Sequence, residues 1–187
     1  MDNLVFSCTD SLDQPARPAC TTDYGEAVVA IALMKEGGTF SVVASDGPTA
    51  AEFETAITAG EVTFITGISN GHRVKTGSTE LSGDDTITGG TEEYDKQYRV
   101  EGRIKLLNEA VKRATEKYDR YSTLRAWYFT DKNYCLGGTG GYKVSPSFDL
   151  VIQEGRGQPP YIPFTLDFTA IGADYAVQDA DFADLEN

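Results

Sequence analysis

The stretch of the chain that most resembles a chemical motif is residues 134–142, YCLGGTGGY, in which four glycines surround one threonine. The amides of a glycine-rich loop can bind phosphate when a helix follows, as in the pattern GxxxxGK followed by Ser or Thr. Here Gly141 is followed by Tyr142 and Lys143, and then by a strand-like, proline-containing run, VSPSFDLVI. The sequence therefore predicts neither a phosphate site nor a dinucleotide site. It predicts a hairpin loop at 137–141, in which glycine supplies positive φ angles.

The only histidine, His72, and the three cysteines, Cys8, Cys20 and Cys135, are the other candidates for catalysis or metal binding. A neighbouring histidine can activate a cysteine as a nucleophile. However, His72 lies in a polar segment, and nothing in the sequence brings it near Cys135. Zinc sites need several Cys or His ligands at short spacing, which this chain lacks. We therefore predict no catalytic residue, no metal site and no cofactor.

Acidic clusters at Asp84-Asp85 and at Asp179, Asp181 and Asp184 could in principle hold calcium. Neither follows the EF-hand pattern of alternating acids, a central glycine and a terminal glutamate, so we interpret them as solvated acids. A pair of carboxylates for glycoside hydrolysis remains open, because 29 acids offer many accidental pairs.

The aromatic run RAWYF contains the single tryptophan, Trp127. We expect a core position for it. The alternative is an aromatic platform for a ligand, formed with Tyr128 and Asp131 near the glycine loop.

Composition and charge exclude several classes of protein. The chain of 187 residues is long enough for one domain with a sizeable core, and its 19 glycines favour many turns and short strands. A net charge of −13 disfavours general binding to nucleic acid or to an anionic membrane. No apolar run approaches the roughly 20 residues that span a bilayer. The start, MDNLVFSCTD, does not resemble a signal peptide, so we expect cytoplasmic synthesis and reduced thiols, with Cys8–Cys20 pairing left open.

The elements that must position these residues are mainly strands. Apolar or alternating runs predict strands at 27–36, 39–45, 61–67, 124–131, 142–155 and 161–172. The run at 27–36 is apolar on both faces, which indicates a central strand or a strand at a subunit boundary. Pro48, a Thr49–Glu52 capping box and Gly60 predict a short helix between them. The polar segment 68–92 predicts a long hairpin or loop, with a turn at Asn70-Gly71.

A long amphipathic helix is predicted at about 97–120. Its apolar stripe recurs at spacings of four and three residues: Val100, Ile104, Leu107, Val111, Ala114 and Tyr118. Gly102 is unfavourable in a helix interior, so it marks either a helix start or a close backbone approach. Residues 96–125 carry nine bases and four acids, an excess of positive charge that suits either a solvated helix face or a contact with an acidic subunit.

These elements predict an α+β fold: a mainly antiparallel β-sandwich or open barrel with one long amphipathic helix and one short helix. The expected domain is 25–172. It is preceded by an extended N-terminal arm, 1–24, and followed by an acidic C-terminal arm, 173–187, which has five acids and no base.

The layout of EAVVAIALMKEGGTF, LSGDDTITGG, VEGRIKLLNEAVKRATEKY, LRAWYF and YIPFTLDFTAIG resembles the bacteriophage tail-tube (major tail) protein family over residues 25–172. The resemblance rests on the order of elements and involves no fixed motif. It implies a β-sandwich or barrel flanked by a helix, in subunits that form hexameric rings. Stacked rings would make a tube through which DNA passes, and an acidic lumen would let DNA slide. The short helix at 49–59 and the cysteines depart from this pattern.

We therefore expect a non-enzymatic virion structural protein, made in the bacterial host cytoplasm, that binds copies of itself and other virion proteins. DNA would pass without specific binding, and no membrane is involved. The segment 68–92 and the two arms would join successive rings. The alternatives are a head–tail connector, a tail terminator or a capsid-accessory protein. From another class, the alternative is a small-molecule or glycan-binding module, or a hydrolase.

Overall fold

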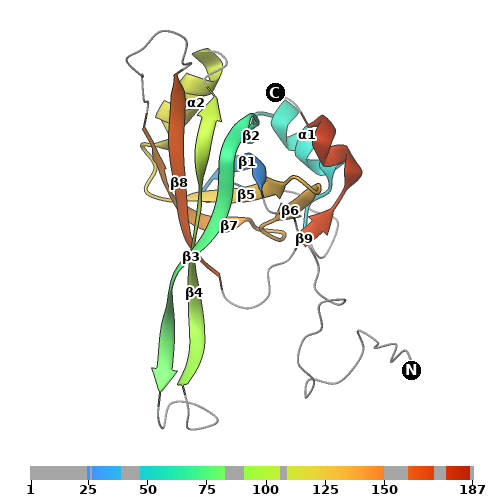
Figure 1. Ribbon diagram of the computed structural model, residues 1–187. Helices are drawn as coiled ribbons and strands as arrows, with labels where there is room; N and C mark the ends of the chain where they lie inside the picture. Colours follow the sequence, from blue (N-terminus) through green and yellow to red (C-terminus); the bar gives the residue numbers. More distant parts are fainter. Residues whose placement is uncertain are drawn as a thin grey trace, which may run out of the picture.

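The computed structural model describes residues 25, 27–38, 47–82, 91–105, 109–149, 160–170 and 176–185. They form a mainly antiparallel β-sheet with two α-helices, an α+β fold (Figure 1). The strand expected at 39–45, the arm at 1–24, and the ends of the strands expected at 142–155 and 161–172 lie wholly or partly outside the described residues. The elements, in chain order, are β1 Val28–Lys35, α1 Ala50–Thr58, β2 Val62–Ile65, β3 Ile68–Ser82, β4 Thr91–Lys105, α2 Glu109–Tyr118, β5 Leu124–Thr130, β6 Tyr134–Leu136, β7 Tyr142–Phe148, β8 Tyr161–Ala170, β9 Ala176–Gln178 and the 3₁₀ helix η3 Ala180–Asp184.

The described strands form one open sheet in the order β2-β1-β5-β7-β8-β4-β3, and every pairing between them is antiparallel. Two short strands extend it at one side, since β6 pairs with β5 and β9 pairs with β6. Twist brings the far edge back toward the middle, and β3 contacts β1 although the two strands are not neighbours in the sheet.

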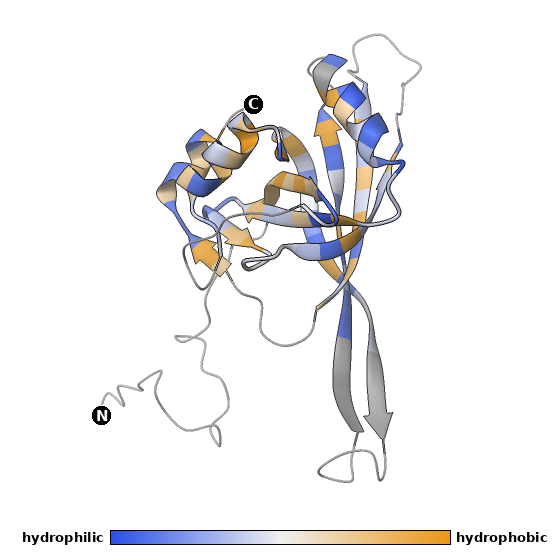
Figure 2. Ribbon diagram, turned by 180° about the vertical axis from the view of Figure 1, so that it is seen from behind, coloured by the Kyte–Doolittle hydropathy of each residue, from blue (hydrophilic) through white to orange (hydrophobic). Residues whose placement is uncertain are grey.

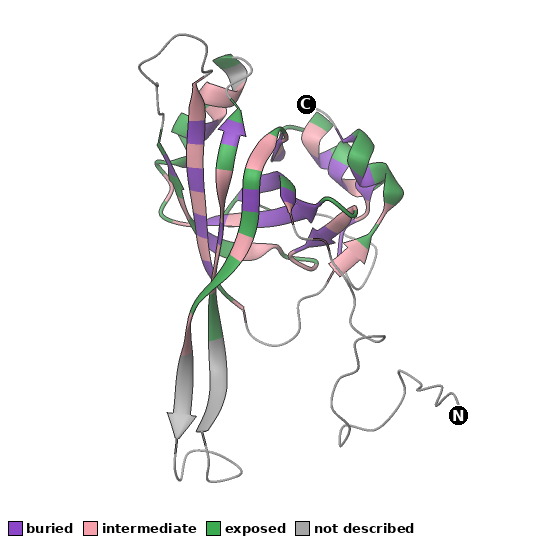
Figure 3. Cartoon of the chain, in the orientation of Figure 1, coloured by how far each residue is buried: buried purple, intermediate pink, exposed green. Residues whose placement is uncertain are grey.

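Two hydrophobic clusters lie on opposite faces of the central strands. The first core is enclosed by the curved sheet and contains Ile31, Leu33, Ile104, Leu124, Ile162, Phe164 and Leu166 among its buried residues. The second core lies between the sheet and the pair α1 and η3, and it contains Ala32, Phe53, Phe64, Trp127, Phe129 and Phe182. Figure 3 shows buried residues concentrated on these central strands.

Strand β1 contributes to both cores, which explains its continuous apolar sequence. Ile31 and Leu33 face the first core, whereas Ala30, Ala32 and Met34 face the second. This is the central strand that the sequence predicted as one of two readings. Both of its faces are covered by the chain itself.

The short helix α1 is confirmed together with both of its end signals. Thr49 and Glu52 form the capping box, in which Glu52 Oε2 accepts a hydrogen bond from the Thr49 amide at 2.7 Å. At the other end the Gly60 and Glu61 amides donate to the carbonyls of Ile57 and Ala56. Gly60 has φ +72°, so this end is a Schellman motif that requires glycine.

The long helix predicted at about 97–120 is wrong in its first half. Residues up to Lys105 belong to β4, and the helix α2 spans only Glu109–Tyr118. Val100 and Ile104 are four residues apart, a spacing that fits one face of a helix and equally one face of a strand. Strand pairing decides the outcome, because β4 is hydrogen-bonded to β3 on one side and to β8 on the other.

Gly102 therefore marks a close backbone approach, one of the two readings that the sequence left open. A Cβ atom on Gly102 would lie 3.0 Å from the Cα of Gly71 in β3. The turn predicted at Asn70-Gly71 is also wrong, because the two residues form a bulge within β3, with Asn70 at φ +55°. A Cβ on Gly71 would lie 2.1 Å from the Val28 carbonyl oxygen, so the bulge lets β3 contact β1.

The C-terminal segment is not an extended arm over its described part, 176–185. It forms β9 and η3, and it buries Phe182 and Leu185 in the second core. Phe182 packs edge-on against Phe53 and Phe129, with ring centroids 6.2 and 5.2 Å apart. Burial of two apolar side chains thus outweighs the polar composition of the segment.

Candidate functional site

The glycine loop 137–141 encloses the side chain of Trp127. Cβ atoms placed on Gly137 and Gly141 would lie 2.6 and 2.9 Å from atoms of the indole ring, and both glycines have positive φ. Trp127 Nε1–H donates a 2.8 Å hydrogen bond to the Gly138 carbonyl. The positive φ angles are as predicted. The predicted hairpin is not formed. Strands β6 and β7 do not pair with each other, because both pair with β5, at residues that come after and before Trp127 in the sequence.

The aromatic platform proposed as an alternative is not exposed. Trp127 is 0% and Tyr128 4% exposed, as the core interpretation predicted. The Tyr128 hydroxyl accepts a 2.8 Å hydrogen bond from Arg73, whose guanidinium lies 4.7 Å from the Tyr98 ring centroid. Asp131 lies at the turn after β5. Because both rings are buried, Trp127 and Tyr128 do not form an exposed aromatic platform.

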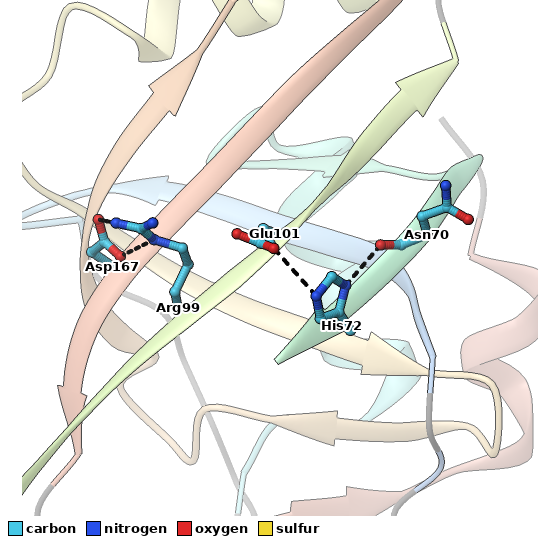
Figure 4. Close-up of polar contacts among 5 residues, drawn as sticks. All are labelled: Asn70, His72, Arg99, Glu101 and Asp167. Atoms are coloured by element: carbon cyan, nitrogen blue, oxygen red, sulfur yellow. Dashed lines mark hydrogen bonds and ion pairs between the residues drawn. The ribbon is translucent and has the colours of Figure 1, made fainter. Parts of the chain in front are cut away.

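His72 and Cys135 have separate surroundings. His72 lies on β3, where its Nε2 is 3.2 Å from Glu101 Oε1 and its Nδ1 is 2.9 Å from the Asn70 carbonyl (Figure 4). Cys135 lies on β6 in the second core, and burial raises the pKa of its thiol well above the ordinary value. A thiol held protonated by burial is a poor nucleophile. Cys8 and Cys20 lie outside the described residues.

The acids predicted to be solvated include one with a structural role. Asp179 accepts two hydrogen bonds, from the Ala50 amide at 3.1 Å and from the Asp181 amide at 3.1 Å, so it joins the starts of α1 and η3. Asp181 and Asp184 are exposed. Within the described ranges no three His, Cys, Asp or Glu residues are grouped so that they could hold a metal ion. Asp84 and Asp85 lie outside those ranges.

An open groove of about 660 Å³ is lined by residues of β3, β4, β7 and β8. Its most ordered polar pair is Arg99 with Asp167, which is bidentate, with Nε–Oδ1 and Nη2–Oδ2 distances of 2.7 and 3.0 Å (Figure 4). These hydrogen bonds raise the pKa of Arg99. Each partner satisfies the other in this pair, so its two charges neutralise one another across β4 and β8. Sequence reasoning missed this pair because cross-strand neighbours are far apart in the chain.

The hairpin of β3 and β4 extends away from the body, as Figure 1 shows. Within the described residues, the pairing of β4 with β8 reaches Lys96–Ala170, and the register of β3 with β4 continues from Ser78–Lys96 to Ser82–Thr91. We call the part beyond Ser78–Lys96, residues 79–82 and 91–95, the distal hairpin. In the described part of the chain, its two strands pair only with each other. The hairpin predicted for 68–92 is thus present and longer than expected.

The basic segment 96–125 does not form one helix. Its charges divide among β4 (Lys96, Arg99, Arg103, Lys105), α2 and the turn after it (Lys112, Arg113, Lys117, Arg120) and β5 (Arg125). The four bases of α2 and the turn after it lie within nine residues of the chain. That group is the part of the predicted basic element that could contact a partner.

Comparison of the sequence with protein-family models and with curated proteins gives no match. None of the helices that the structure describes is both long and apolar enough to span a membrane.

Proposed function

We propose that this chain is a non-enzymatic virion structural protein that assembles with copies of itself into rings or a tube, similar to the bacteriophage tail tube. The observation that carries the proposal is the distal hairpin, which projects from the body and pairs only within itself among the described strands. A two-stranded ribbon is marginally stable in water by itself. Its unpaired edges are also templates for another chain. A neighbouring subunit would satisfy both requirements.

The finer fold prediction, a barrel or sandwich, belongs to this proposal. The contact of β3 with β1 at Gly71 and the enclosed first core support a barrel closed by side chains and open in its hydrogen bonding. The described sheet path ends at β2 and at β3, and the distal hairpin is part of β3 and β4. Contacts between subunits would then depend on the projecting hairpin and on surface elements.

The net charge of −13 supports the passage of DNA without binding, because phosphate is repelled from an acidic wall. Hexameric rings, location in the virion, synthesis in the host cytoplasm and contacts with other virion proteins are part of the proposal through the resemblance to tail-tube proteins. A head–tail connector, tail terminator or capsid-accessory protein would use the same self-association.

Replacement of residues 79–95 by Asn-Gly tests the role of the hairpin. The two-residue turn would join Ser78 to Lys96, a cross-strand pair, so the ladder between β4 and β8 stays intact. Deletion of the whole segment 68–91 would be less informative, because it also removes Gly71 and Arg73, which contact the body. We expect a folded monomer by circular dichroism and loss of assembly by negative-stain microscopy.

A matched control separates strand pairing from charge. Residues 79–95 contain six acids and no base, and the control keeps the hairpin while changing these acids to amides (E80Q, D84N, D85N, E92Q, E93Q and D95N). The control should assemble if backbone pairing joins the subunits. Normal rings or tubes from the shortened variant would refute the proposed role.

A further inference from the structure

Helix α2 presents a basic outer face. Val111, Thr115 and Tyr118 turn toward the body, where the Tyr118 hydroxyl lies 2.8 Å from Thr63 Oγ1 of β2. Arg113, Lys117 and Arg120 on the other side are exposed, and the side chain of Arg113 is 77% accessible. Figure 2 shows the resulting alternation of hydrophilic and hydrophobic residues along the helix.

The pairs within this face are weak. Arg113 lies 3.6 Å from Glu109, both of them exposed, and the half-buried Lys112 lies 4.0 Å from Glu116. Exposed pairs of this kind contribute little and exchange partners easily. Arg113, Glu116, Lys117, Arg120 and Tyr121 line a shallow groove of about 330 Å³.

An acidic surface lies on α1 and η3, in a different part of the molecule (Figure 1). A groove of about 420 Å³ runs between these elements, with Ala50, Ile57 and Leu185 among its apolar lining. Glu54, Asp181 and Asp184 stand at this groove, and all three residues are exposed. No ion pair to any of the three occurs in the described part of the chain, and neither 47–61 nor 176–185 contains a Lys or Arg.

We propose that α2 of one copy binds the groove between α1 and η3 of the next copy. The two surfaces have opposite charge, and each has apolar or aromatic groups beside its charges. Their lengths also match, since helices of ten and nine residues are about 15 and 13 Å long. This inference rests on the proposed self-assembly and names one contact that would produce it.

The contact is heterologous, because it joins two different surfaces of the same chain. Repetition of such a contact gives a closed ring when the rotation closes and an open filament when it does not. It leaves the distal hairpin available for a second contact. A binding partner of another kind, such as a basic segment of a different protein, is the competing occupant of the groove.

Charge reversal tests the contact. One variant carries R113E, K117E and R120E on α2, and a second carries E54K, D181K and D184K at the groove. Each variant by itself would place like charges together, and we expect the protein concentration needed for assembly to rise by about tenfold or more. An equimolar mixture should assemble again, because every contact in an alternating order of the two variants joins opposite charges. Sedimentation velocity measures all three samples.

The chain that carries both sets of reversals is the matched control, because it has the wild-type net charge and restores complementarity. It should assemble like the wild type, with circular dichroism confirming the fold of each variant. Single variants that assemble normally, or a mixture and a combined variant that both remain monomeric while folded, would overturn the contact. A wild-type chain that never assembles would overturn the proposed function as well. If the wild type and both charge-reversal variants assemble equally well, this contact is refuted and the proposed function is not.

Discussion

Trp127 and the glycines around it show how a motif with the composition of a ligand-binding loop can serve the core. The indole occupies the space that side chains at 137 and 141 would fill, and the Gly138 carbonyl satisfies its N–H group. A buried indole N–H without a partner is costly, so the loop supplies both room and a hydrogen bond. The sequence predicted no phosphate site, because a strand-like run and not a helix follows the loop. No signal within the loop sequence indicated that its glycines would contact Trp127.

Substitution of Gly141 by alanine should destabilise the protein by about 2 kcal/mol, because a left-handed backbone and contact with the indole both oppose a Cβ atom. Urea unfolding followed by tryptophan fluorescence measures the change. Gly140→Ala is the matched control: a Cβ there meets nothing within 4 Å, and the expected change is within about 0.5 kcal/mol. Equal effects at the two positions would contradict the enclosing role of Gly141.

Glu36 provides a pH-dependent link at the edge of the body. Its carboxylate lies 2.7 Å from Lys143 Nζ and accepts a hydrogen bond from the Thr123 hydroxyl. Hydrogen bonds from Lys143 and then from Thr123 lower the pKa of Glu36 below the ordinary value of 4.5. The folded state therefore gains stability from this group above that value and loses it as pH falls through the lowered pKa.

Glu36→Gln should lower the melting temperature slightly at neutral pH, because the pair is exposed, and should have no effect at low pH, where the carboxylate is protonated in both states. Thermal unfolding of the two proteins between neutral and acidic pH checks this. The difference in melting temperature should shrink toward low pH, and a difference that stays constant would argue against the assignment.

At the scale of elements, the sequence predicted correctly the structure that depends on a few neighbouring residues. It did not predict correctly the structure that depends on pairing between strands. The capping box and Gly60 predicted α1 within one residue at each end, because caps are local interactions. The stripe at 100–118 was divided between β4 and α2, because Val100 and Ile104 fit both periods. The strand is favoured by the two partners of β4, the preceding strand β3 and the distant strand β8.

The C-terminal segment gave a similar error. Its acids indicated a solvated arm, whereas Phe182 and Leu185, three residues apart, were the signal for a buried turn. Asp179, read as one of several solvated acids, joins η3 to the first turn of α1. This hydrogen bond cannot be predicted from the sequence, because it connects residues that are 129 positions apart.

Phe182→Ala tests whether η3 is part of the domain. Phe182 is buried against two aromatic rings, so its truncation should cost about 3–5 kcal/mol in the free energy of unfolding. The neighbouring Asp181→Asn, at an exposed position, is the control and should change stability by less than about 0.5 kcal/mol. Chemical denaturation measures both, and a mild effect at Phe182 would mean that η3 is only loosely attached.

At the scale of the whole molecule, three surface features have no evident role in a single copy of the chain. The distal hairpin lacks other strand partners in the described chain, α2 presents bases, and the groove of α1 and η3 presents acids. Composition predicted the charge contrast. It assigned the bases to one long helix, whereas they are divided among β4, α2 and β5.

These surfaces lie on different elements, so one copy can contact neighbours in more than one direction. A hairpin contact and a contact between α2 and the groove would together give rings that can also stack, as a tube requires. The two sets of variants act on different contacts. Loss of one contact with retention of the other should therefore give short oligomers, which differ from both monomers and tubes.

The most direct measurement of the central claim, self-association, is sedimentation velocity of the unmodified chain over a wide range of concentrations. We predict that a species of 20.3 kDa gives way, as concentration rises, to particles the size of a ring or larger. A single sedimenting species of monomer mass at every concentration would contradict the account.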